Sequence, residues 1–255
     1  MNTFDHLSGE HLEIDGAKIY YEVRGNREGP TLLFLHGGLG TIEDFNSILP
    51  DLSGDFRVVG IDSRGHGKST LGSGDLTYER IQKDVLRVLE HLGIDAVSII
   101  GFSDGGIVAY RLAALTSPRV EKLVTIGGDW RLPEGPTREI LSQVTGGSWR
   151  AEFPEAHEVY RQHNPEPDFD AFVQSVVKMW LDPGASGYPN EAVRNISCPL
   201  LIVRGDDDHL VPLKGDVELR GMIEGSKLLN IPFAGHSAFE DQKDIFLMSL
   251  RQFLD

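Results

Sequence analysis

Cysteine is nearly absent from this chain, which has only Cys198 among its 255 residues. An intrachain disulfide is therefore excluded, and the apolar run PLLIV that follows Cys198 predicts a small buried side chain without a catalytic role. Long hydrophobic runs that could span a membrane are also missing, and the opening residues MNTFDHLSGEHLEIDG lack the pattern of a secretory signal. We therefore expect a cytoplasmic protein.

Positive charge is scarce as well. Lysine and arginine together number 24 against 39 aspartates and glutamates, so the formal net charge is −15. This charge repels the phosphates of nucleic acids and anionic lipid headgroups, and no local run of basic residues offsets it. The sequence therefore argues against nucleic-acid binding and membrane-surface binding, and it leaves the oligomeric state open.

Short apolar runs alternate with helical patterns over most of the chain. Candidate strands cover residues 18–23, 31–35, 56–61, 97–101, 121–126, 199–203 and 227–231. Candidate helices, with apolar residues at helical spacing, cover residues 78–92, 104–116 and 239–254. Repeated β-α units of this kind predict an α/β fold, with a mostly parallel sheet flanked by helices.

The alternation stops between Gly128 and Cys198, where prolines cluster and no candidate strand occurs. A connection of this length is better explained as a structured insertion over a site than as an ordinary loop. We therefore predict an α/β core formed by residues 1–128 and 198–255, with a helical cap inserted over residues 129–197. Aromatic residues concentrate in this cap, and Trp130 and Trp180 are candidates for lining a substrate pocket.

The clearest motif for chemistry surrounds Ser103. The run GFSDG over residues 101–105 follows a candidate strand and begins a candidate helix, which is the setting that the pattern G-x-S-x-G requires. Glycines two positions on either side of the serine let the strand and the helix approach closely. The motif predicts that Ser103 is a nucleophile on a strained turn. The alternative is an incidental serine in a glycine-rich turn.

Backbone donors for an oxyanion hole are predicted on both sides of the serine. The run LHGGLG over residues 35–40 ends an earlier candidate strand, and its small residues allow a backbone N–H to turn toward the nucleophile. Gly38, or failing that Leu39, should supply one donor and the backbone N–H of Asp104 the other. We expect His36 to brace this loop rather than to act as a base.

The general base and its carboxylate partner are predicted from their places after late strands. His236 follows the last candidate strand, and loops at the carboxyl ends of parallel strands converge on a site. Asp208 follows the preceding strand and should orient the imidazole of His236. His209 is a rival base, whereas Asp206 and Asp207 are expected to act as turn or capping residues. The order Ser, Asp, His is typical of α/β-hydrolases.

With these motifs together, the chain resembles the α/β-hydrolase superfamily over nearly its whole length. The motifs HGGLG, DSRGHGKS, GFSDGG and GDDDHLVP, followed by a later GH, occur in the order of that superfamily. GFSDGG and the size of the cap are most similar to the biphenyl hydrolase-like group, which includes valacyclovir hydrolase. The resemblance implies a serine hydrolase that needs no cofactor and cleaves small carboxylic esters, amino-acid esters among them.

Other functions stay open on the sequence. Cofactor-free perhydrolase or haloperoxidase chemistry and carbon–carbon bond hydrolysis use the same three residues, and a ligand receptor can keep them on a hydrolase scaffold. The side chain of Asp104 either recognises a substrate ammonium group, or pairs with a neighbour such as Arg64 or braces the turn. No metal site is expected, because the spacing of His157 and His163 in the cap does not indicate one.

Overall fold

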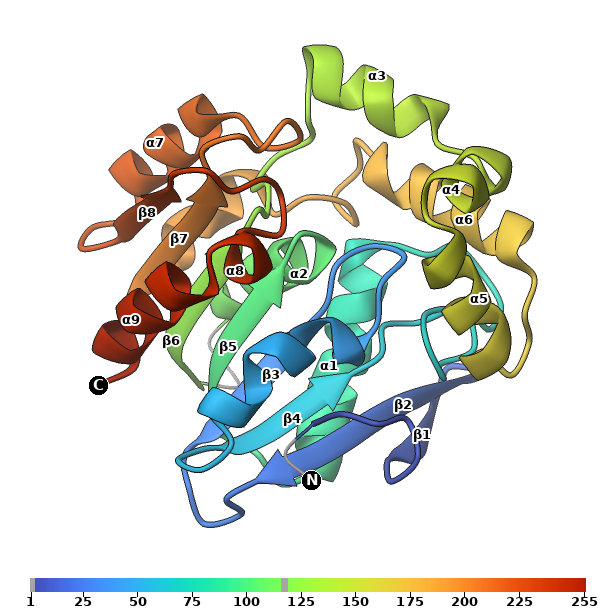
Figure 1. Cartoon of the computed structure of the whole chain (residues 1–255), viewed down its shortest axis with the longest axis horizontal. Coiled ribbons are helices and arrows are strands. Elements are labelled where there is room, and N and C mark those ends of the chain that lie inside the picture. Colours follow the sequence, from blue (N-terminus) through green and yellow to red (C-terminus); the bar gives the residue numbers. More distant parts are fainter. Residues whose placement is uncertain (1–2, 116–118) are drawn as a thin grey trace.

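A computed structural model describes residues 3–115 and 119–255. Its centre is an eight-stranded sheet with the strand order β1-β2-β4-β3-β5-β6-β7-β8 (Figure 1). The pairs β1–β2 and β2–β4 are antiparallel, and every pair from β4 onward to β8 is parallel. The strands are β1 (Glu10–Ile14), β2 (Ala17–Gly25), β3 (Thr31–Leu35), β4 (Arg57–Ile61), β5 (Ala96–Phe102), β6 (Arg119–Ile126), β7 (Leu200–Gly205) and β8 (Lys227–Ile231).

Each strand predicted from an apolar run is present, with ends that differ by at most two residues. Strand β1 was missed because it is mostly exposed and has only two apolar side chains, Leu12 and Ile14. It forms a hairpin with β2 through Asp15 and Gly16, whose φ angles are 53° and 74°. Two positive φ angles at an Asp-Gly pair are typical of a tight hairpin turn, so the dipeptide carried the signal that the apolar pattern lacked.

Helices cover both faces of the sheet. They are α1 (Tyr78–His91), α2 (Asp104–Ala113), α3 (Gly135–Gln143), α4 (Gly146–Glu152), α5 (Pro154–His163), α6 (Phe169–Trp180), α7 (Leu213–Met222), α8 (Ala238–Asp241) and α9 (Lys243–Leu254), with short 3-10 helices η1 (Ile42–Ser47), η2 (Leu49–Asp51) and η3 (Asn190–Asn195). The prediction of one helix over 239–254 is wrong, because the non-helical backbone of Gln242 (φ −132°, ψ 56°) separates α8 from α9. The end of the predicted helix 104–116, at Thr116, lies outside the described residues.

The core consists of two apolar clusters, one on each face of the sheet. Along β3, Leu33 and Leu35 belong to one cluster, whereas Leu32 and Phe34 belong to the other, as the alternation of side chains along a strand requires. Residues of α1 and α2 fill the first cluster, and residues of η1, η2 and α9 fill the second. Both faces of the inner parallel strands β3, β4, β5 and β7 are therefore buried, which explains their continuous apolar runs.

The segment from 129 to 197, which is described throughout, contains α3 to α6 and η3 and has no strand. In Figure 1 these four α-helices lie along the top and right of the view, whereas α9 lies at the lower left. Their contacts with one another include α4 with α5 and α6, and α3 with α6. A helical cap would have this composition, and the division of the chain into core and cap stays a prediction.

None of the helices within residues 3–115 and 119–255 has both the length and the apolar character that crossing a bilayer demands.

Candidate active site

Ser103 lies on a sharp turn between β5 and α2. Its backbone has φ 50° and ψ −115°, a strained conformation for a residue with a side chain, and its N–H donates to the carbonyl of Ile126 at 2.8 Å. A Cβ at Gly101 would lie 2.4 Å from the carbonyl oxygen of Gly105, and one at Gly105 would lie 2.0 Å from that of Leu35. Only glycine therefore fits on either side of the turn.

A continuous chain of hydrogen bonds links three side chains at this turn. His236 Nε2 lies 3.0 Å from Ser103 Oγ, and His236 Nδ1 lies 2.9 Å from Asp208 Oδ2. The other oxygen of Asp208 accepts the backbone N–H groups of Leu210 and Val211, at 2.8 and 3.1 Å. Burial opposes the charge on Asp208, but the hydrogen bonds from His236 and the two backbone donors outweigh it and lower the pKa of that carboxyl.

The topology of the sheet explains why residues so far apart in the sequence meet. Ser103 follows β5, Asp208 follows β7 and His236 follows β8, so all three stand at the carboxyl ends of parallel strands. The structure therefore brings together the serine, aspartate and histidine that the sequence singled out. The rival base His209 has an exposed side chain, and the hydrogen bond to Ser103 Oγ comes from His236.

The loop after β3 approaches the serine from the other side. A Cβ at Gly37 would lie 3.3 Å from the Cβ of Ser103, and one at Gly38 would lie 2.5 Å from the Oδ2 atom of Asp104. Leu39 has a positive φ of 60° and turns the chain away. The ring of His36 braces this loop: its Nδ1 lies 2.7 Å from the carbonyl of Gly37 and its Nε2 accepts the N–H of Ser63.

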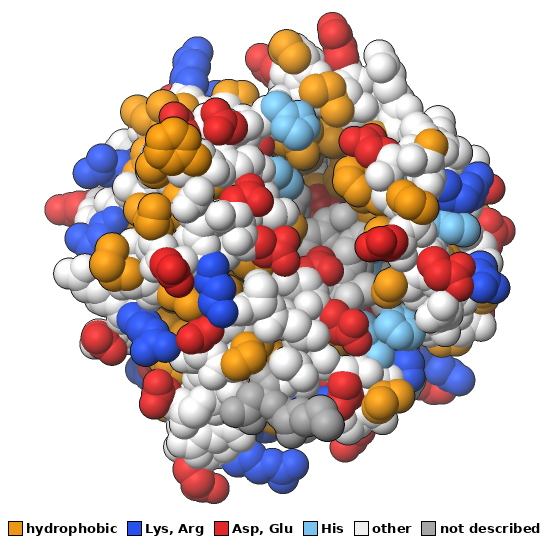
Figure 2. Space-filling view, viewed as in Figure 1, with side chains coloured by type: hydrophobic (Ala, Val, Ile, Leu, Met, Phe, Trp, Pro, Cys, Tyr) orange, Lys and Arg blue, Asp and Glu red, His pale blue; other side chains and the backbone are white. Residues whose placement is uncertain are grey.

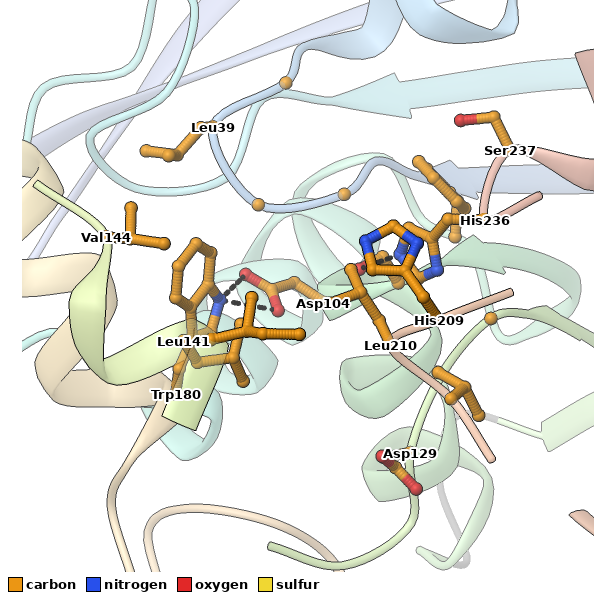
Figure 3. Close-up of a pocket in the computed structure, with 18 of the residues that line it drawn as sticks. Leu39, Asp104, Asp129, Leu141, Val144, Trp180, His209, Leu210, His236 and Ser237 are labelled. Atoms are coloured by element: carbon orange, nitrogen blue, oxygen red, sulfur yellow. Dashed lines mark hydrogen bonds between the residues drawn. The ribbon is translucent and has the colours of Figure 1, made fainter. Parts of the chain in front are cut away.

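The side chain of Asp104 is held by two donors from different helices. Its Oδ1 accepts the hydroxyl of Tyr78 at 2.7 Å, and the indole N–H of Trp180 lies 2.9 and 2.8 Å from its two oxygens (Figure 3). Pairing with Arg64, one of the alternatives predicted from the sequence, is wrong, because Arg64 binds both oxygens of Asp84 instead. Burial raises the pKa of Asp104 to about 6, against the effect of its two donors.

The two tryptophans predicted to line the pocket, Trp130 and Trp180, lie in different places. Trp180 lines the pocket beside Ser103. Trp130 is not among the residues that line it, which corrects the prediction for this residue. Its indole N–H donates to the carbonyl of Gly215 at 3.1 Å, and the guanidinium of Arg131 lies 4.7 Å from its ring, so Trp130 secures the loop after β6 against α7.

The pocket above Ser103 has a volume of about 640 Å³. Figure 2 shows the face of the molecule hollowed near its centre, with acidic side chains around the hollow. In Figure 3, Leu141 of α3, Val144 just after α3 and Trp180 of α6 lie on one side, and His236, Leu210 and Ser237 lie on the other. The volume suits a small organic molecule, and the apolar side chains of Leu141, Val144 and Trp180 suit an uncharged group on it.

Acidic side chains are the unexpected feature of this pocket. Among the described residues that line it, six are acidic and none is lysine or arginine; the acidic residues are Asp44, Asp104, Asp129, Glu152, Glu240 and Asp241. Burial raises the pKa of Asp44 and of Asp129 to about 7. Apart from Asp104, sequence reasoning missed these residues, since only the net charge of −15 hinted at an acidic site.

Comparisons with known proteins agree with this architecture. The family described as "alpha/beta hydrolase fold" matches residues 30–177. The bifunctional esterase/perhydrolase DCH of Acinetobacter calcoaceticus is 28% identical over 87% of this chain and 90% of that protein. Human serine hydrolase BPHL is 29% identical over 91% of this chain and 81% of that protein.

A solved structure of a hydrolase from Pseudomonas aeruginosa PA01 has the same fold, with a TM-score of 0.80 and 24% identity over 98% of this chain and 99% of that one. The family match extends from the end of the loop before β3 to α6, and so includes both Ser103 and the loop of Gly38. From its sequence and its fold alike, this chain is a hydrolase that belongs to the α/β-hydrolase fold family.

Proposed function

We propose that this chain is a serine hydrolase that cleaves small carboxylic esters through an acyl-enzyme intermediate. The observation that carries the proposal is the hydrogen-bonded chain from Ser103 Oγ through His236 to Asp208 at the base of the pocket. A hydroxyl is a weak nucleophile unless an adjacent base takes its proton, and His236 Nε2 lies within reach of that proton. Asp208 holds the imidazole in the productive tautomer and stabilises the imidazolium that forms.

The reaction then has two halves. Ser103 Oγ bonds to the ester carbonyl carbon while its proton moves to His236, and the collapse of the tetrahedral intermediate expels the alcohol with that proton. Water, deprotonated by His236, next attacks the acyl-enzyme and releases the acid. The backbone N–H groups of Asp104 and of Gly38, or of Leu39 in its place, stabilise the oxyanion in each half, and losing one such donor costs about 3 to 4 kcal/mol.

The acidic lining of the pocket favours some classes of substrate over others. Acidic side chains without a lysine or arginine among the described lining residues repel an anionic substrate, which disfavours the keto-acid of a carbon–carbon bond hydrolase. The same lining favours neutral esters and esters with an ammonium group, such as amino-acid esters. Among the described residues, the hydrogen-bond partners of the Asp104 carboxylate are two neutral donors and include no cationic side chain. A substrate ammonium would supply the missing counter-charge.

A perhydrolase activity is a second candidate, because one relative is described as a bifunctional esterase/perhydrolase. Hydrogen peroxide would replace water in the second half of the reaction and yield a peracid from the same acyl-enzyme. This activity would accompany ester hydrolysis rather than replace it.

Turnover of short-chain p-nitrophenyl esters tests the proposal against a receptor on a hydrolase scaffold. We expect multiple turnovers by the wild type and almost none by Ser103→Ala. Ser175→Ala is the matched control, because the hydroxyl of Ser175 bonds the carbonyl of Ala171 within α6, and this is its one hydrogen bond among the described residues. A wild type that binds such esters without turning them over would favour the receptor.

A further inference from the structure

A second cluster of ionisable side chains lies outside the pocket, where the N-terminal segment, η1 and the end of α5 meet. His6, Glu43 and His163 each offer one possible metal-ligand atom, and these atoms lie within 4.8 Å of one another. None of the three lines the pocket above Ser103. The cluster therefore has no part in the proposed ester hydrolysis.

His6 is fixed in one orientation by its surroundings. Its backbone has a φ of 50°, which is unusual for histidine, and its N–H donates to Glu22 at 2.7 Å. Its Nε2 lies 2.7 Å from Oδ2 of Asp62, a buried carboxylate that also accepts the backbone N–H groups of Ile42 and Lys68. Donation of one ring N–H to a carboxylate is the usual arrangement of a metal-binding histidine, since it presents the other nitrogen to the metal.

The other two side chains complete a ligand set around Nδ1 of His6, which faces Glu43. Oε1 of Glu43 lies 2.8 Å from Nδ1 of His6. The ring of His163 lies 4.4 Å from the ring of His6, between centroids. Within the part of the chain that the structure describes, the buried Nδ1 of His163 has no hydrogen-bond partner. A buried polar atom without a partner destabilises the folded chain, and a bound metal ion would give this nitrogen one.

We propose that His6, Glu43 and His163 bind a divalent transition-metal ion, with Zn²⁺ the best match, and that the ion ties α5 of the cap to the N-terminal segment and η1. Two imidazoles and one carboxylate are a ligand set that Zn²⁺ accepts, with water in the fourth position. Ligands at zinc bonding distance lie about 3.4 Å apart. Nδ1 of His6 and Oε1 of Glu43, which are 2.8 Å apart, must therefore separate slightly, and the ligand atom of His163, within 4.8 Å of both, must settle at the same spacing. Glu43, whose side chain is about one-third exposed, has the freedom to do so.

Metal binding to chelator-treated protein tests the proposal. We would measure the stoichiometry of Zn²⁺ by calorimetry at pH 8, where protons compete less for imidazole, and the visible absorption of bound Co²⁺. The wild type should bind one equivalent more than His163→Gln or Glu43→Gln, and Zn²⁺ should raise its melting temperature. Because only the difference between proteins is counted, metal bound at other histidines does not affect the result.

His157→Gln is the matched control, because His157 lies on the same helix but packs against Phe169. This variant should keep the full stoichiometry and the shift in melting temperature. Circular dichroism establishes whether each variant is folded. If His163→Gln does not fold, Glu43→Gln alone is compared with the wild type. The absence of saturable binding at micromolar Zn²⁺, or an unchanged stoichiometry in the folded variants, would overturn the proposal.

Discussion

The indole N–H of Trp180 points at the carboxylate of Asp104 and lies within 2.9 Å of both of its oxygens. This contact joins the last residue of α6 to the first residue of α2, the helix that begins directly after Ser103. Without the indole, the buried carboxylate would keep only the hydroxyl of Tyr78 as a side-chain donor. The contact therefore couples α6 to the turn that presents the serine.

Replacing Trp180 with phenylalanine should destabilise the protein. The buried carboxylate loses a donor while most of the apolar contact of the ring is kept, so we expect the free energy of unfolding to fall by about 1 to 3 kcal/mol. Urea unfolding at neutral pH measures this. Trp149→Phe is the control, because the indole nitrogen of Trp149 has no hydrogen-bond partner among the described residues. Equal losses in the two variants would show that the hydrogen bond contributes nothing.

The carboxylate of Asp104 should also decide between charged and uncharged esters. We expect the wild type to hydrolyse an amino-acid ester with a higher kcat/KM than its deaminated analogue, because the ammonium meets an otherwise uncompensated carboxylate. Asp104→Asn should lower this ratio about tenfold, which corresponds to about 1.4 kcal/mol. The same ratio in both proteins would assign Asp104 to bracing the turn alone.

Most strands of the sheet and the three residues Ser103, Asp208 and His236 could be predicted from the sequence. Each of the strands β3 to β8 contains an apolar run, and in β3, β4, β5 and β7 this run is continuous because these strands are buried on both faces. Ser103, Asp208 and His236 were found because each follows such a strand in a motif with defined chemistry. The strand β1 was not predicted, because it is mostly exposed and its sequence contains no continuous apolar run.

The features of the site that could not be predicted depend on contacts between distant segments of the chain. The spacing of residues along the sequence does not reveal such contacts. The partners of Asp104 come from α1 and α6, so neither Tyr78 nor the indole of Trp180 could be assigned to it. Trp130 was misplaced because an aromatic residue in a cap can face either the pocket or the protein interior. The spacing of His163 gave no sign of the cluster with His6 and Glu43, since the three residues lie far apart in the chain.

The stability of the protein should depend on pH through Asp129. Burial raises the pKa of this carboxyl from 3.8 to about 7, so between about pH 4 and 7 the unfolded chain has released a proton that the folded protein still holds. Stability due to this group therefore falls as pH rises through that window and is constant above it. Asp129→Asn should gain stability over the wild type at pH 8 and not at pH 4, by urea unfolding.

Asp95→Asn is the control for this pH dependence, because Asp95 is exposed. Its difference from the wild type should be the same at both pH values. A gain for Asp129→Asn that does not change between pH 4 and pH 8 would contradict the assignment of a raised pKa to Asp129.

The role of Asp208 can be separated from that of its neighbours in the same loop. Asp208→Asn removes the negative charge behind His236 and favours the wrong tautomer, which lowers kcat by about 10⁴-fold in comparable triads. Asp207→Asn should leave kcat nearly unchanged, since the side chain of Asp207 is exposed. Steady-state kinetics on one ester at constant pH compares them. A similar loss in both variants would move the carboxylate role away from Asp208.

Covalent labelling of Ser103 tests the central claim most directly. A fluorophosphonate bonds to an activated serine hydroxyl and mimics the tetrahedral intermediate of ester hydrolysis. Intact mass spectrometry of the wild type should show one added phosphonyl group with parallel loss of esterase activity, and peptide mapping should place it on Ser103. Ser103→Ala should take up no label and have no activity. A label on another residue, or a Ser103→Ala protein that still hydrolyses esters at the wild-type rate, would contradict the assignment of Ser103 as the nucleophile.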